Sequence, residues 1–133
     1  MTAAYSFKQV VAFVRVLAPD WTESMADARL GMWRKQFDLP HGARGGGKGR
    51  PTAYTKDMLV EIGLMVEMSL LGLAGQEAAK RVKQGPDRDI PAAGFAYWMV
   101  DGADSSAILI NRSKIERAIE AQPRPRDYIR IAA

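Results

Sequence analysis

The apolar residues at the start of the chain repeat with the spacing of a helix. Over residues 6–18 they lie three or four positions apart, which places them on one stripe of a helix that Pro19 ends. A second helix is predicted from about Thr22 to Phe37. Asp20 and Thr22 can each accept a hydrogen bond from a free amide, and Glu23 follows Asp20 with capping-box spacing. The apolar side of this second helix is expected at Met25, Ala28, Leu30, Trp33 and Phe37.

Two further helices are predicted after residue 54. Thr55 is a good N-cap for a helix that runs to about Leu71, where Gly72 stops it. A shorter helix is predicted over residues 75–83, with an apolar side at Ala78, Ala79 and Val82. The methionines of this part of the chain are interpreted as adaptable core filler. They are Met58, Met65 and Met68, together with the earlier Met32.

Beyond residue 89 the period of the pattern changes to two. Residues 85–89 break the helical pattern and mark the expected internal boundary. Residues 95–100 and 107–110 are rich in aromatic and β-branched side chains, which predicts an antiparallel hairpin. A last helix is expected from Ser113 and Glu116 as a capping box, with Ile115 and Ile119 on its apolar edge. Residues 128–131 alternate and are expected to add an edge strand.

These elements predict a mainly helical fold with a small β part, of the α+β class. The order is a winged helix-turn-helix, then a β-hairpin and a short C-terminal helix. We expect a DNA-binding region over residues 1–84 and a dimerisation or partner-binding region over residues 85–133.

A glycine-rich segment separates the second and third helices. Residues 41–54 contain five glycines, with Arg44, Lys48 and Arg50 among them. No helix is stable with that composition, so we predict a basic hairpin or wing. A nucleotide-binding loop also uses glycine and lysine. However, the pattern Gly-x-x-x-x-Gly-Lys-Ser/Thr does not occur here and no buried strand precedes the segment, so nucleotide binding is not favoured.

The positive charge of the chain is concentrated around this segment. The whole chain has a formal net charge of +4, whereas residues 29–56 contain seven bases and one acid. The rest of the chain has twelve bases and fourteen acids. A solvated surface loop would explain an isolated run of bases. Here the run adjoins a predicted helix-turn-helix, the unit that lays its second helix in the major groove, so the charge favours a polyanion partner.

Several segments occur in an order that is typical of one family. They are LGMWRKQFDLP at residues 30–40, the basic glycine-rich segment, AYTKDML at residues 53–59 and LGLAGQEAAKRV at residues 71–82. Through these segments, which cover about its first two thirds, the chain resembles the MerR-type winged helix-turn-helix family. The matching positions are Leu30, Trp33, Leu39, Pro40, Tyr54, Leu59, Leu71 and Gly72. The resemblance implies that the wing bases and Tyr54 contact phosphates.

The chain also departs from that family. Gly31 stands where the family usually has an arginine that contacts a phosphate, Arg34 replaces the usual glutamate, and Thr52 replaces an arginine. The long C-terminal helix through which the family dimerises is replaced by the predicted hairpin and short helix. The effector binding of the family is therefore not carried over, and the chain has no cysteine for metal sensing.

The function predicted from these features is that of a sequence-specific, double-stranded DNA-binding transcriptional regulator. Phosphate contacts are expected from Arg44, Lys48 and Arg50, with Arg34 and Lys35 also at the DNA backbone. Base contacts are expected from the N-terminal half of the second helix, because that half reaches deepest into the groove. The residues that could read bases there are Glu23, Ser24, Asp27 and Arg29. Trp33 and Phe37 are expected in the core.

Other classes of function compete with this prediction. A phage-type excision or architectural DNA-binding factor, or a protein-interaction module, would use the C-terminal hairpin as its main surface. An enzyme has little support, because the sole histidine, His41, has no evident carboxylate or serine partner and the acids show no catalytic spacing. No cofactor is expected.

Composition excludes further classes. Without cysteine the chain can be neither a disulfide scaffold nor a thiolate metal site. No apolar run approaches the ~20 residues of a membrane-spanning helix. Lys8 and Arg15 lie inside the first apolar run, whereas a signal peptide places its charge before the run, so we expect these residues to belong to the fold.

The expected partners are double-stranded DNA and a second copy of the chain, in the cytoplasm at the nucleoid. RNA polymerase or another regulator is a further candidate partner. The edge of the hairpin could pair across a twofold axis to form a homodimer. The residues assigned to this surface are Phe95, Tyr97, Trp98, Ile108 and Ile110. The alternative is that the hairpin packs on the third helix and completes the core of a monomer.

Overall fold

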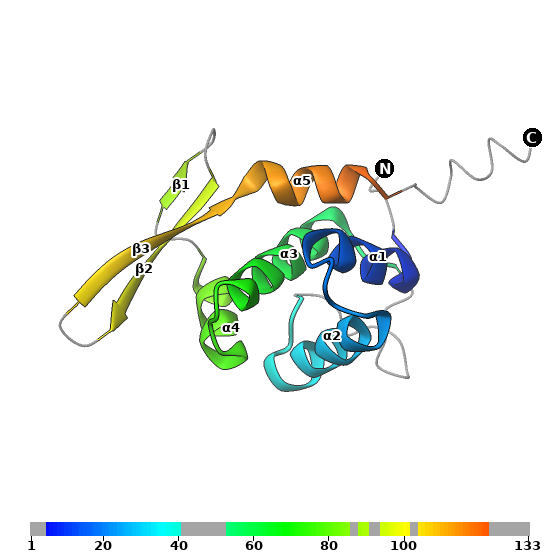
Figure 1. Cartoon of the computed structure of the whole chain (residues 1–133), viewed down its shortest axis with the longest axis horizontal. Helices are drawn as coiled ribbons and strands as arrows, with labels where there is room; N and C mark the ends of the chain where they lie inside the picture. Colours follow the sequence, from blue (N-terminus) through cyan, green and yellow to red (C-terminus); the bar gives the residue numbers. More distant parts are fainter. Residues whose placement is uncertain (1–4, 41–52, 86–87, 91–93, 102–103, 123–133) are drawn as a thin grey trace, which may run out of the picture.

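The computed structural model describes residues 5–40, 53–85, 88–90, 94–101 and 104–122. These residues form a mainly helical structure with a small antiparallel sheet (Figure 1). The helices are α1 (Phe7–Leu17), α2 (Glu23–Phe37), α3 (Lys56–Leu70), α4 (Gly75–Gln84) and α5 (Arg112–Glu120). The strands are β1 (Arg88–Ile90), β2 (Gly94–Asp101) and β3 (Asp104–Asn111).

Side-chain caps explain where the helices begin. The Ser6 hydroxyl accepts from the Gln9 amide at 3.1 Å while the Gln9 side chain accepts from the Ser6 amide at 2.8 Å, a complete capping box for α1. The hydroxyls of Thr22 and Thr55 accept from the Met25 and Met58 amides, each at 3.2 Å, and so cap α2 and α3. The expected cap of the last helix is wrong by two residues. Asn111 accepts from the Ser113 amide at 2.9 Å, because its short amide side chain suits the position where a strand turns directly into a helix.

Helix α3 is the centre of the core. It packs against α1, α4 and α5, and Figure 1 shows it running between them. The predicted start and end of α3 are confirmed, as is the buried side of α4. Met65 and Met68 are buried as expected, but Met32 is exposed, so its interpretation as core filler is wrong.

The buried side of α2 differs from the expected one. Ala26, Leu30 and Trp33 are buried, whereas Met25 and Ala28 are exposed. Both sets have helical spacing, so periodicity alone does not distinguish them. The small side chain of Ala26 faces the protein interior, and Met25 and Ala28 therefore lie on the solvent side of the helix.

The C-terminal elements share the core of the N-terminal ones. Strands β2 and β3 pair in register from Gly94 opposite Asn111 to Asp101 opposite Asp104, so they run longer than the two predicted segments. Strand β1 pairs with β2 and occupies part of the expected boundary. Ile110, Ile115 and Ile119 are buried in one cluster with residues of α1 and α3. The expected division at residue 84 therefore separates segments that pack together.

Candidate nucleic-acid interface

The turn between α1 and α2 is held by Trp21. Its amide donates to the carbonyl of Ala18 at 3.0 Å, and its own carbonyl accepts from Arg15 Nε at 3.2 Å. Its buried ring lies 6.5 Å from the ring of Trp33, centroid to centroid, in the middle of α2. The turn is thus anchored to both helices, which fixes the direction in which α2 leaves it.

Arg29 rests on the same tryptophan. The guanidinium carbon of Arg29 lies 4.3 Å from the centroid of the Trp21 ring, a cation–π contact. This contact restricts a long and flexible side chain to one flank of α2. A positive charge is thereby placed beside the exposed face of the helix, at its middle.

The exposed face of α2 combines polar, small and apolar side chains. Ser24 and Lys35, both expected at the DNA, are exposed. Met25 and Met32 leave 40% and 37% of their surface accessible, and Ala28 between them is also exposed. No side chain on this face is acidic among the described residues of α2. Sequence reasoning missed Met25, Ala28 and Met32 as surface residues.

The acids of α2 lie on another side of the helix. Glu23 and Asp27 line a groove between α1 and α2 together with Lys8 and Arg15 of α1. The groove has a volume of about 390 Å³ and is therefore lined by two acids of α2 and two bases of α1. Glu23 and Asp27 are expected to read bases together with Ser24 and Arg29, but of these four residues only Glu23 and Asp27 line this groove.

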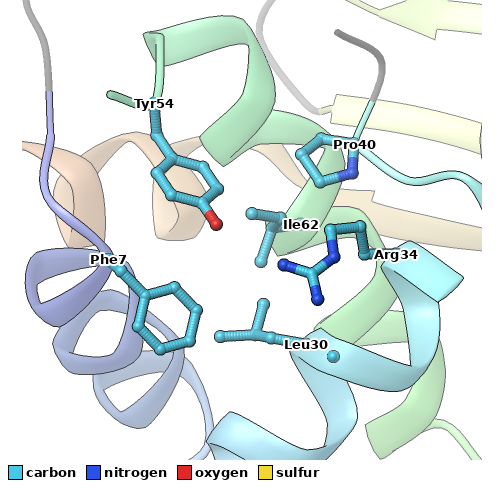
Figure 2. A pocket seen from close by; sticks show the side chains of 7 residues that line it. Phe7, Leu30, Arg34, Pro40, Tyr54 and Ile62 are labelled. Atoms are coloured by element: carbon cyan, nitrogen blue, oxygen red, sulfur yellow. The ribbon is translucent and has the colours of Figure 1, made fainter. Parts of the chain in front are cut away.

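Arg34 lies at the far end of α2, beside the start of α3. It lines a small hollow with Pro40 and Tyr54, and Figure 2 shows its guanidinium and the Tyr54 hydroxyl pointing into this space. The hollow has room for about one water molecule, so it is too small for a phosphate group. Arg34 is half-buried here.

Tyr54 does not occupy the surface position that the resemblance implies. Its side chain is only 4% exposed and its ring lies 6.3 Å from that of Phe7. Its backbone forms a bridge to Tyr5, with two N–H to O distances of 2.9 Å. The tyrosine therefore has a packing role at the start of α3, and the expectation of a phosphate contact from its side chain disagrees with this burial.

The two ends of the glycine-rich segment lie close to each other. Pro40, before residues 41–52, and Tyr54, after them, line the same hollow as Arg34. The segment therefore leaves and rejoins the described structure at the C-terminal end of α2. Arg44, Lys48 and Arg50, and also His41, lie outside the described residues.

The residues assigned to a dimer surface are only partly described. Phe95, Tyr97, Trp98 and Ile108 belong to β2 and β3, and their side chains lie outside the description. Ile110 is buried against the helices, so in a single chain it is a core residue. The expected strand at residues 128–131 lies outside the described residues.

Comparison with known proteins gives no match for the chain among protein-family models, curated proteins or solved structures. In the described part of the chain, none of the helices is both long enough and apolar enough to cross a membrane.

Proposed function

We propose that the protein is a sequence-specific, double-stranded DNA-binding regulator that resembles the MerR type, with α2 in the major groove and residues 41–52 as the wing. The observation that supports this most is the charge of residues 29–56, which contain seven bases and one acid. This run begins on α2 with Arg29 and continues beyond its C-terminal end. Bases in such a concentration attract a polyanion over a long range.

The geometry of α1 and α2 supports the same proposal. A short turn anchored by Trp21 joins the two helices, and the second helix presents Ser24, Lys35 and the flanking Arg29 to solvent. The glycine-rich segment starts and ends beside Arg34 at the end of that helix. Bases in the segment would then contact phosphates next to the groove in which α2 lies.

The salt dependence of DNA binding tests this proposal. Neutralising four to six phosphates gives a slope of about −4 to −5 in a plot of log affinity against log salt concentration. Arg44→Ala and Arg50→Ala should each reduce the slope by about one unit and weaken binding to all sequences alike. Affinity that does not change with salt, or a double variant that binds as tightly as the wild type, would contradict the assignment of the wing.

Sequence preference separates a regulator from an architectural factor. Both would show the salt dependence, because phosphate contacts dominate affinity in both. Selection from random duplexes should return a defined motif if the protein is a regulator. A pool without sequence preference would instead favour the architectural alternative.

We also propose that the regulator acts as a homodimer, since one winged unit offers few base contacts. Within the described residues, β3 pairs with β2 along one side only, so its other edge is a candidate for pairing with a second copy. Leu109 on β3 is 53% exposed and would lie near such an interface. Sedimentation of the full chain at micromolar concentration should give twice the mass of the chain, and a monomer that still occupies a single half-site would refute the dimer.

A further inference from the structure

The exposed face of α2 has an apolar centre. Met25, Ala28 and Met32, which we call the methionine face, are spaced three and four residues apart and therefore lie together on one side of the helix. Lys35 extends the same side toward the C-terminal end, and Arg29 lies on its flank. The acids Glu23 and Asp27 line the groove toward α1 instead.

Such a surface has an unusual combination of chemistry. The flanking bases favour a polyanion, whereas the centre would gain free energy only from contact with another apolar group. Methionine in particular adapts to an irregular apolar partner, because its side chain is unbranched and flexible. A polyanion that presents apolar groups between its negative charges would match both features of this face.

We infer that the methionine face contacts the C5-methyl groups of thymine in the major groove. This inference rests on the proposed DNA-binding function and assigns part of its specificity. In the major groove the thymine methyl is the apolar group that the base edges present, and the phosphates flank it on both sides. The methionine face, an apolar centre with the basic side chains of Arg29 and Lys35 next to it, matches that pattern.

The dimensions of the helix fit several successive base pairs. Met25 and Met32 are seven residues apart, which corresponds to about 10 Å along a helix and to about three base-pair steps of DNA. Ala28 and Gly31 are small, and a Cβ atom added at Gly31 would meet no other atom within 4 Å. Small residues between the methionines let the helix backbone approach the base edges closely.

Replacing thymine by deoxyuridine tests the inference, because the substitution removes the methyl group and leaves every hydrogen-bonding group in place. The affinity of the full chain would be measured by fluorescence anisotropy at low salt for short duplexes of alternating A·T and of alternating A·U. We expect weaker binding to the A·U duplex, by about fourfold for each methyl contact, from ~0.8 kcal/mol per buried carbon group. Replacing cytosine by 5-methylcytosine in a G·C duplex adds a methyl group in the same groove and should raise the affinity.

Variants connect the effect to the methionine face. Met25→Gln combined with Met32→Gln keeps the side-chain length but removes its apolar end, so the preference for A·T over A·U should disappear. Leu70→Gln alters a comparably exposed apolar residue at the end of α3, 47% exposed, and should leave the preference unchanged. Lys35→Gln removes a charge and should weaken binding to both duplexes by the same factor.

The outcomes separate the inference from the function on which it rests. Equal affinity of the wild type for A·T and A·U duplexes would overturn it, as would a preference that survives in the double glutamine variant. A double variant that changes the sedimentation of the free protein would also overturn it, because the face would then contact a second copy. If neither duplex binds at low salt, the proposed DNA-binding function itself is refuted.

Discussion

Gly63 of α3 lies directly against Ile115 of α5. A Cβ atom added at Gly63 would lie 2.9 Å from Ile115 Cγ2 and 3.1 Å from Phe13 Cζ of α1. Three helices therefore meet at a position where only a hydrogen atom fits. This contact joins the C-terminal helix to α3 and to α1, the helix on which α2 packs.

Gly63→Ala should therefore destabilise the protein. Alanine favours a helix by up to about 1 kcal/mol over glycine, but overpacking a buried contact typically costs about 1 to 3 kcal/mol, and the β-branched Ile115 has little freedom to move. Gly31→Ala is the matched control, because a Cβ atom at Gly31 meets open space. This variant gains the helix preference of alanine without overpacking and should raise the free energy of unfolding. Urea denaturation of both variants measures the two effects. A stabilised Gly63→Ala protein would contradict the close approach.

A chain that ends at Gln84 should lose its stable fold. The missing part includes Ile110, Ile115 and Ile119, which are each at most 2% exposed and are buried in one cluster with residues of α1 and α3. Removal of one such side chain costs about 2 to 5 kcal/mol, so loss of all three costs about 6 to 15 kcal/mol, which is comparable to the whole stability of a typical domain. Circular dichroism during heating should show no cooperative transition. A cooperative transition in the truncated chain would show that residues 1–84 fold as an independent domain.

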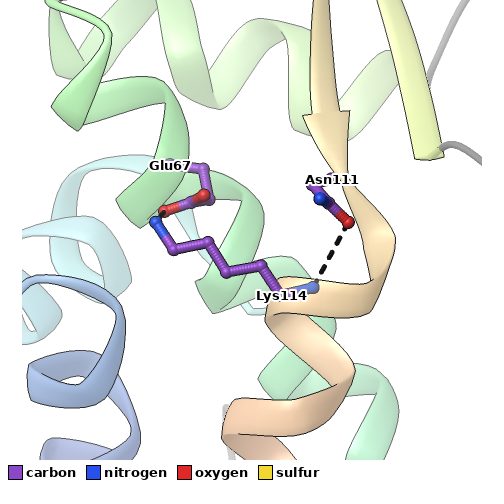
Figure 3. Close-up of polar contacts among 3 residues, drawn as sticks. All are labelled: Glu67, Asn111 and Lys114. Atoms are coloured by element: carbon purple, nitrogen blue, oxygen red, sulfur yellow. Dashed lines mark hydrogen bonds and ion pairs between the residues drawn. The ribbon is translucent and has the colours of Figure 1, made fainter.

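The ion pair between Glu67 and Lys114 should also stabilise the packing of α5 on α3. Lys114 Nζ lies 2.9 Å from Glu67 Oε2, and Figure 3 shows it beside the Asn111 cap of α5. The side chain of Glu67 is 11% exposed and that of Lys114 is 43% exposed, so the pair is only partly screened by solvent.

Lys114→Met should cost more stability than Glu67→Gln, because it leaves a nearly buried carboxylate without its cation. A double-mutant cycle with both changes should give a coupling energy of about 1 kcal/mol. A coupling energy near zero would show that the two charges do not stabilise the fold.

Arg29 should affect sequence discrimination more than overall affinity. Because Trp21 holds its guanidinium beside the exposed face of α2, the side chain is preorganised for a base edge. Arg29→Ala should lose ~1 to 3 kcal/mol of discrimination between selected and random duplexes. Selection from random oligonucleotides with both proteins measures this loss. An unchanged motif would assign Arg29 to the phosphate backbone.

The hydrophobic pattern predicted the helices better than it predicted their orientation. Starts and ends depend on local chemistry such as the Thr22 and Thr55 caps, which is visible in the sequence. On α2, however, Met25 and Ala28 compete with Ala26 for the buried side at nearly the same spacing, and only packing on α1 decides between them.

The sequence indicated which residue types could bind DNA better than it indicated which of these residues reach the surface. Ser24 and Lys35 lie on the exposed face as expected, whereas Tyr54 is buried. The support of Arg29 by Trp21 depends on a turn that brings together residues eight positions apart, and no periodic signal indicates it. Likewise, the burial of Ile110 follows from the place where β3 meets the helices.

Cross-linking from the exposed face of α2 tests the central claim most directly. The chain contains no cysteine, so Ala28→Cys provides a single attachment point for a photoreactive label at the centre of the methionine face. Ser113→Cys on α5 is the matched control, because Ser113 is exposed and α5 lies on the opposite side of α3 from α2 (Figure 1). If α2 lies in the major groove, illumination with duplex DNA should give a covalent protein–DNA product from Ala28→Cys and little from Ser113→Cys. A stronger product from Ser113→Cys, or none from Ala28→Cys while the labelled protein still binds DNA, would contradict the claim.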